Sequence, residues 1–280
     1  MAAWFKKSKP GSNILRVFRI TDMPFARNFD GVSLIEFAAK RIEQVTGQAP
    51  TGYSANYQRK DWKTLDEFAR SARKLRELTF AIATHEHELA LMYTNSLVGF
   101  KDPPAIGSIE LMICCPEGSI SLDHLTVLAK EIYSVLPFDY GYVHRLDSDC
   151  DPQTERKLKR TIFGSIVSET RKEDSVWLYH MMAVRHGCVK GVYPMNFLNG
   201  SHLSNPTLAR LVSKGVGNIH ALNDHLTLWF LTPADVSFAL QALARSGSVI
   251  GHDQGRDEFL RGLRAAEYRQ AMWRAQDRSE

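Results

Sequence analysis

Apolar residues along the chain follow two periods, one typical of strands and one typical of helices. Short runs rich in β-branched and aromatic residues predict strands at residues 14–20, 108–115, 139–146 and 224–231. Apolar residues three and four positions apart predict helices at residues 32–45, 64–78, 121–135, 206–214 and 233–246. These segments form the framework of the predicted fold.

Other segments have a weaker pattern. Residues 79–94 fit a strand or a hairpin, and residues 175–185 fit a strand or a helix. Residues 152–168 predict a helix, with Pro152 near its first turn. An extended piece is expected within residues 189–198, and a last helix at residues 257–276.

Several predicted helices carry start or stop signals. Thr64 and Glu67 form a capping-box pattern, Pro233 suits a first helical turn, and Gly47 ends the helix that precedes it. Because strands and helices alternate along the chain, we expect an α+β fold in which helices cover a mostly antiparallel sheet. A strand, a proline and a helix follow one another at residues 108–135 and again at 226–246, so two related α+β halves are an open alternative.

Three regions are predicted from these elements. Residues 1–11 form a basic flexible arm, residues 12–250 an α+β domain with a candidate internal boundary near 100–107, and residues 251–280 a C-terminal helical extension. The first twenty residues hold Lys6, Lys7, Lys9, Arg16 and Arg19 and no acid, which is typical of a solvated terminal arm.

Composition narrows the class of protein. The 280 residues are 44% hydrophobic and 24% charged, which excludes a disordered chain, a collagen and a disulfide scaffold. Thirty-five basic and 31 acidic residues leave a net charge of +4, which is small for a nucleic-acid binder. The cysteines lack CxxC spacing, and Cys114 and Cys115 lie in an apolar run as core thiols. No signal-peptide or membrane-spanning run is present, so we expect a soluble cytoplasmic protein, with a cleaved precursor as the alternative.

The motif His85-Glu86-His87-Glu88 has one metal-binding interpretation. On a strand, His85 and His87 share a face and could hold zinc with a third ligand from His180, His186 or His202. The HExxH spacing is absent, and a solvated strand face explains the motif as well. A metal-dependent enzyme therefore stays an alternative hypothesis.

Three acids alternate at Asp147, Asp149 and Asp151. A calcium loop would start in this way, but Pro152 stands where its glycine belongs and Leu158 where its glutamate belongs. The pattern favours a solvated turn with an N-cap from Asp151. A carboxylate cluster that faces a basic partner is the other interpretation.

Catalytic frames are missing from the sequence. There is no GxSxG, GxGxxG or Walker A pattern, and His186 with Cys188 does not by itself define a dyad. We therefore expect a non-enzyme without a cofactor or a metal. Residues 59–76 carry seven basic residues, three acids and Trp62, which could bind nucleic acid but fit the charged outer face of a helix better.

Residues 191–203 form the most distinctive stretch. Pro194 excludes a central strand there, and Asn196 and Asn199 can bond nearby backbone and hold an irregular loop that also contains Tyr193. A binding surface is the alternative interpretation.

Residues 192–198 with His202-Leu203, residues 222–229 and residues 140–142 resemble segments of bacterial type VI secretion immunity proteins. The resemblance covers about residues 108–250. It implies a cytoplasmic, non-catalytic inhibitor that binds and neutralises a cognate toxic effector, often a nuclease, with a homodimer as a further option. Candidate partner contacts are Tyr140, Tyr142, Asp147, Asp149, Asp151 and His202. Inhibitors that plug nuclease clefts are often acidic, whereas this chain has a net charge of +4. Three explanations are open: a local acidic patch makes the contact, the inhibitor acts away from the cleft, or the toxin belongs to another class.

Overall fold

A computed structural model describes residues 11–55, 58–74, 79–83, 90–98, 106–160, 166–168, 176–177, 180–251 and 256–264. The chain forms two compact units. Unit 1 comprises Met1–Leu97, Gly107–Phe138 and Val143–Thr170. Unit 2 comprises Val98–Ile106, Asp139–Tyr142 and Arg171–Glu280.

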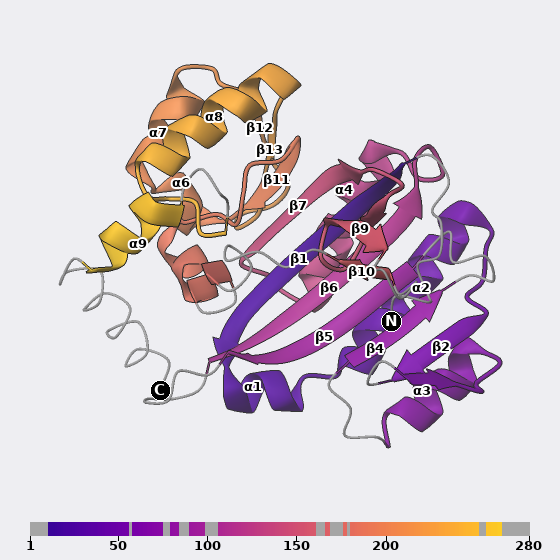
Figure 1. Ribbon diagram of the computed structural model, residues 1–280. Coiled ribbons are helices and arrows are strands. Elements are labelled where there is room, and N and C mark those ends of the chain that lie inside the picture. Colours follow the sequence, from indigo (N-terminus) through magenta and orange to yellow (C-terminus); the bar gives the residue numbers. More distant parts are fainter. Residues whose placement is uncertain are drawn as a thin grey trace. The chain divides into compact units, whose positions relative to one another are not determined.

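Unit 1 is built on a six-stranded antiparallel sheet (Figure 1). Its strands lie in the order β1 (Ser12–Asp22), β6 (Ile106–Pro116), β5 (Ala90–Val98), β4 (Thr79–Ala83), β2 (Gly52–Ala55) and β3 (Gln58–Lys60). Ile82 lies opposite Leu91, so the hairpin interpretation of residues 79–94 is confirmed. Ile14, Leu15, Val17 and Phe18 of β1 are all buried, which explains the β-branched and aromatic run that predicted this strand.

The helices of unit 1 are α1 (Met23–Asn28), α2 (Gly31–Thr46), α3 (Leu65–Ala72) and α4 (Leu122–Val135). Asp30, Thr64 and Ser121 cap the last three, each accepting a hydrogen bond from a backbone N–H of the first turn. Gly47 ends α2 at a φ of +70°, as the sequence predicted. α2 contacts α3, α4 and β4, and α4 contacts β1, so the amphipathic faces of these helices pack against the sheet and each other.

The helix predicted at residues 152–168 is wrong. This region forms a small three-stranded sheet of β8 (Cys150–Asp151), β9 (Arg156–Arg160) and β10 (Ile166–Ser168), with antiparallel pairs. Glu155 has a φ of +58°, which no right-handed helix can accommodate. The turn is held by an ion pair with Arg16, which is far away along the chain. The apolar pattern of residues 152–168 therefore could not predict it.

Unit 2 contains three antiparallel strands of its own. β12 (Asn218–Ala221), β13 (Thr227–Phe230) and β11 (Met195–Leu198) lie in this order, and the residues Tyr140–Tyr142 at the start of β7 (Tyr140–Leu146) adjoin β11. The helices are a 3₁₀ helix η1 (Met181–His186), α6 (Gly200–Leu203), α7 (Pro206–Ser213), α8 (Pro233–Arg245) and α9 (Arg256–Arg264).

The core of unit 2 surrounds Trp229. Its indole Nε1 donates a hydrogen bond to the Val216 carbonyl at 2.9 Å, and Phe197, Leu208 and Leu243 are buried as well.

The expected α+β class with a mostly antiparallel sheet and a C-terminal helix is confirmed. Residues 1–10 of the predicted arm and 265–280 of the predicted extension lie outside the described residues. Among the helices that the structure describes, none is long and apolar enough to cross a membrane.

Candidate partner-binding site

The acidic turn, residues Asp147–Asp149, joins β7 to β8 in unit 1. The carboxylates of Asp147 and Asp149 are exposed, whereas Asp151 is half-buried. The backbone holds the turn, because Cys150 N–H donates to the Asp147 carbonyl at 3.0 Å and Leu158 N–H to the Asp149 carbonyl at 2.7 Å. The two exposed carboxylates thus project from a hydrogen-bonded turn.

Asp151 has an internal role in the next turn. Its Oδ1 accepts from Gln153 N–H and its Oδ2 from the Thr154 hydroxyl, both at 3.0 Å. The sequence predicted a capping role for this residue, but Asp151 caps the β8–β9 turn rather than a helix. Its carboxylate is therefore already engaged within the chain.

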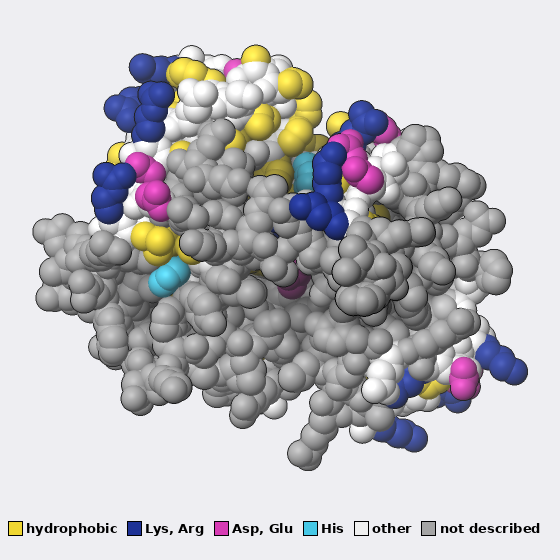
Figure 2. Space-filling model, in the orientation of Figure 1, with side chains coloured by type: hydrophobic (Ala, Val, Ile, Leu, Met, Phe, Trp, Pro, Cys, Tyr) yellow, Lys and Arg dark blue, Asp and Glu magenta, His cyan; other side chains and the backbone are white. Residues whose placement is uncertain are grey.

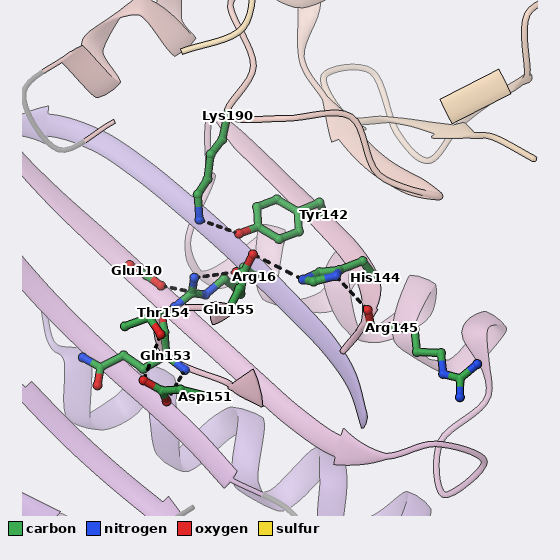
Figure 3. A network of polar contacts seen from close by, with 10 residues as sticks. All are labelled: Arg16, Glu110, Tyr142, His144, Arg145, Asp151, Gln153, Thr154, Glu155 and Lys190. Atoms are coloured by element: carbon green, nitrogen blue, oxygen red, sulfur yellow. Dashed lines mark hydrogen bonds and ion pairs between the residues drawn. The ribbon is translucent and has the colours of Figure 1, made fainter. Parts of the chain in front are cut away.

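A buried arginine anchors the β8–β9 turn to the sheet (Figure 3). Arg16 of β1 is 4% exposed. Its Nε lies 3.0 Å from Glu110 of β6, its Nη1 lies 2.5 Å from Glu155, and its Nη2 donates to the Gln153 carbonyl at 2.5 Å. One guanidinium therefore joins two strands of the sheet to the hairpin that carries the acidic turn.

His144 of β7 extends this network. Its Nε2 lies 3.3 Å from the Glu155 carboxylate and its Nδ1 lies 3.0 Å from the Arg145 carbonyl. His144 thus lies beside the same carboxylate that Arg16 contacts, and both side chains reach Glu155 from the sheet.

Apolar side chains seal the base of the acidic turn. Ile14, Met112, Cys114 and Leu146 form a buried cluster, and Cys150 packs against it. Burial, followed by the nearby Asp149 charge, raises the pKa of the Cys150 thiol, so this cysteine is protonated at neutral pH and is a poor nucleophile. Burial also raises the pKa of Cys114 to about 11, in agreement with the expected core role.

The structure places Tyr140 and Tyr142 inside unit 2. Both are fully buried. The Tyr140 hydroxyl donates to the Gly191 carbonyl at 2.9 Å, Tyr142 stacks on Tyr193 with ring centroids 3.9 Å apart, and Lys190 Nζ donates to the Tyr142 hydroxyl at 2.9 Å. In this arrangement the two tyrosines organise the interior and present no side chain to a partner.

His202 is also fully buried. Its Nε2 lies 3.1 Å from the Cys188 carbonyl, and its Nδ1 lies beside Asn199, which caps α6. Burial lowers the pKa of His202 to about 4, so the ring is neutral at physiological pH. With both nitrogens occupied, His202 is a structural residue here and supplies no third zinc ligand.

The irregular loop predicted at residues 191–203 is only partly present, because Met195–Leu198 form the strand β11, which lies between β13 and β7. The exclusion of a central strand by Pro194 is therefore wrong for the residues that follow this proline. Asn196 accepts from Tyr193 N–H at 3.1 Å and donates to the Tyr193 carbonyl at 2.6 Å, while Pro194, which directly precedes β11, is exposed. Asn205, which the sequence did not single out, caps α7 and donates to both the Gly187 carbonyl and the Ser248 hydroxyl. Asn205 thereby ties the start of α7 to two other segments of unit 2.

The alternative functions were a metal-dependent enzyme and a nucleic-acid-binding module. His85 and His87 lie outside the described residues. No group of three or more His, Cys, Asp and Glu side chains that could hold a metal ion occurs in the part of the chain that the structure describes. In the basic segment, Arg73 pairs with Glu36 at 2.9 Å and Trp62 packs edge-on against Phe68, in agreement with the charged outer face of a helix.

Sequence reasoning missed the anchor of the site. Arg16 and Arg19 both interrupt the apolar run of β1, and a charge within such a run is a signal for a buried ion pair, which the structure forms at Arg16. Glu110 likewise interrupts the apolar run of β6. Glu155 had no comparable signal, because its partners lie far away along the chain.

Comparison with known proteins adds a distant likeness. No protein-family model matches the chain, and no curated protein sequence matches it. The structure is similar to that of the Pseudomonas aeruginosa T6SS protein PA0821, with 11% sequence identity and a TM-score of 0.48 over 83% of this chain and 73% of that one. A likeness this distant assigns no function.

Proposed function

We propose that this protein is an immunity protein, which binds a cognate type VI secreted effector in the cytoplasm and neutralises it without catalysis. The observation that carries the proposal is the acidic turn: two exposed aspartates directly precede the β8–β9 hairpin, which a buried arginine fixes to the sheet. A recognition element that is rigid before binding loses little conformational entropy on association.

Charge gives this turn a preferred kind of partner. Lys157 pairs with Asp149 at 3.3 Å, but both side chains are more than half exposed, so a partner's cations can compete for that carboxylate. Asp147 forms no ion pair within the described residues. A basic surface on the effector suits this local patch even though the whole chain carries +4.

The segments that resemble immunity proteins are brought together in unit 2. Residues 192–198 include β11 and residues 222–229 include most of β13, and these strands pair with Asn196 opposite Trp229. Tyr140–Tyr142 adjoins β11. The segments that carry the resemblance are therefore neighbours in one folded unit. This supports the view that the resemblance reflects a shared structure and not isolated short matches.

A pull-down of the tagged protein from its own host, with mass spectrometry of the co-eluting proteins, tests the proposal. We expect one stoichiometric partner that is lethal when expressed alone and harmless when co-expressed with this chain. Effector expression is verified in the same culture by proteomics. The proposal is contradicted if the lysate contains toxic type VI effectors and the chain neither binds nor neutralises any of them.

A further inference from the structure

The strand β12 in unit 2 is an unprotected sheet edge. Within the part of the chain that the structure describes, β12 has one neighbouring strand, β13, and all four of its residues are exposed, Ile219 at 37%. Figure 2 shows hydrophobic side chains grouped over the region of α8 and β12. An exposed edge with free hydrogen-bonding groups is a template for another strand.

Ladder geometry fixes which backbone groups face outward. Leu222 N–H donates to the Leu226 carbonyl at 2.9 Å, and the register pairs His220 with Leu228. In an antiparallel ladder the hydrogen-bonded pairs alternate, so Leu222 and His220 point their backbone groups toward β13. Ile219 and Ala221 therefore direct their N–H and carbonyl groups away from it.

The edge lacks the devices that normally block pairing. Residues 216–222 contain no charge and no proline. By contrast β3, the last strand in the order of unit 1, carries Arg59 and Lys60. Natural sheets discourage edge association with charges of this kind, and β12 has none.

We infer that β12 is the docking edge for a second copy of this chain, which pairs antiparallel with it across a two-fold axis through His220. In that register Ile219 of one copy lies opposite Ala221 of the other, and the reverse. Both are outward-facing residues, so their N–H and carbonyl groups form four intermolecular hydrogen bonds. A two-fold axis makes the same short edge complementary to itself, and an uncharged segment brings no like charges together.

The dimer is expected to be weak. A four-residue ladder buries less than the roughly 1,200 Å² at which stable interfaces begin. The inference is independent of the proposed immunity function, because it requires only this chain. Association must then depend steeply on protein concentration.

Sedimentation velocity on the full chain over roughly a hundredfold range of concentration tests the inference. We expect a monomer–dimer equilibrium, which Ala221→Pro weakens at least about tenfold because proline removes the outward N–H from both copies. The matched control Ala221→Ser keeps that N–H and should dimerise like the parent chain. Ile219→Lys, which puts a charge on the edge without changing the backbone, should also weaken the dimer.

Thermal unfolding of each variant shows whether it is folded. If the proline variant does not fold, the lysine variant decides the question. A chain that stays monomeric over the whole concentration range overturns the inference. A dimer that survives the edge substitutions overturns it too, since association then uses another surface.

Discussion

The guanidinium of Arg16 and the carboxylate of Glu155 lie 2.5 Å apart, although 139 residues separate them in the chain. This buried pair holds the β8–β9 turn on the sheet of unit 1, and Glu155 keeps a φ of +58° while it makes the contact. A non-glycine residue adopts that conformation only when its surroundings enforce it. The hairpin that presents the acidic turn is therefore fixed by tertiary interactions.

Removing the arginine should destabilise the protein strongly. Arg16→Met removes a buried cation from beside the half-buried carboxylates of Glu110 and Glu155, and breaking a buried ion pair in this way costs about 3–5 kcal/mol. Arg145→Met is the matched control, because Arg145 is 61% exposed and pairs with the exposed Glu117, so we expect a loss within about 1 kcal/mol. Urea unfolding of both variants measures the difference. Equal losses would show that the Arg16 network does not anchor the fold.

Acid should destabilise the protein through His202. Its folded-state pKa is about 4 against an ordinary 6.5, so between these values the unfolded chain binds a proton that the folded chain excludes. Stability is unaffected above pH 6.5, falls as the pH drops toward 4 and levels off below, with a total loss of about 3 kcal/mol. Burial also lowers the pKa values of His180 and His186, which act in the same direction.

An NMR titration of the His202 ring assigns that effect. The ring should stay neutral well below pH 6, while unfolding in urea requires less denaturant at pH 5 than at pH 7. If the His202 signal titrates near pH 6.5 in the folded protein, the placement of this side chain in a dry core is refuted.

Two neighbouring glycines should respond differently to alanine. Gly215 and Gly217 have φ values of +75° and +70°, so either substitution costs about 1–2 kcal/mol of backbone strain. A Cβ at Gly217 would lie only 2.5 Å from the Phe230 carbonyl oxygen, whereas one at Gly215 meets nothing within 4 Å. We therefore expect Gly217→Ala to lower the free energy of unfolding clearly more than Gly215→Ala. Equal effects in urea unfolding would argue against the close approach of Gly217 to the Phe230 carbonyl.

The sequence predicts the elements whose stabilising contacts are local. α2, α4 and α8 follow from their apolar periodicity, and Gly47 and Pro233 mark the end of α2 and the start of α8. The β8–β9 hairpin could not be predicted in this way. Its basic run 156–160 holds a single apolar residue, Leu158, so no alternation of apolar and polar residues marks a strand, and its turn depends on Arg16 in a distant strand.

The candidate site residues differ in the same way: local sequence predicts the exposure of some and does not predict the burial of others. The exposed positions of Asp147 and Asp149 follow from their acidic, turn-like surroundings. The burial of Tyr140, Tyr142 and His202 does not, because aromatic rings with polar tips suit an interface and a hydrogen-bonded interior equally well. Only the three-dimensional partners, such as the Gly191 carbonyl for Tyr140, distinguish the two.

Binding of the effector by a chain with reversed charge in the acidic turn tests the central claim most directly. The double variant Asp147→Lys, Asp149→Lys is compared with the parent chain and with Asp61→Lys, an exposed acid of unit 1 elsewhere in the chain. The effector captured from the host is the probe, surface plasmon resonance the readout, and thermal unfolding the check on folding. We predict at least about tenfold weaker binding for the double variant, with slower association and a smaller dependence on salt, and no change for Asp61→Lys. Unchanged affinity of the folded double variant would contradict the claim that the acidic turn recognises the partner.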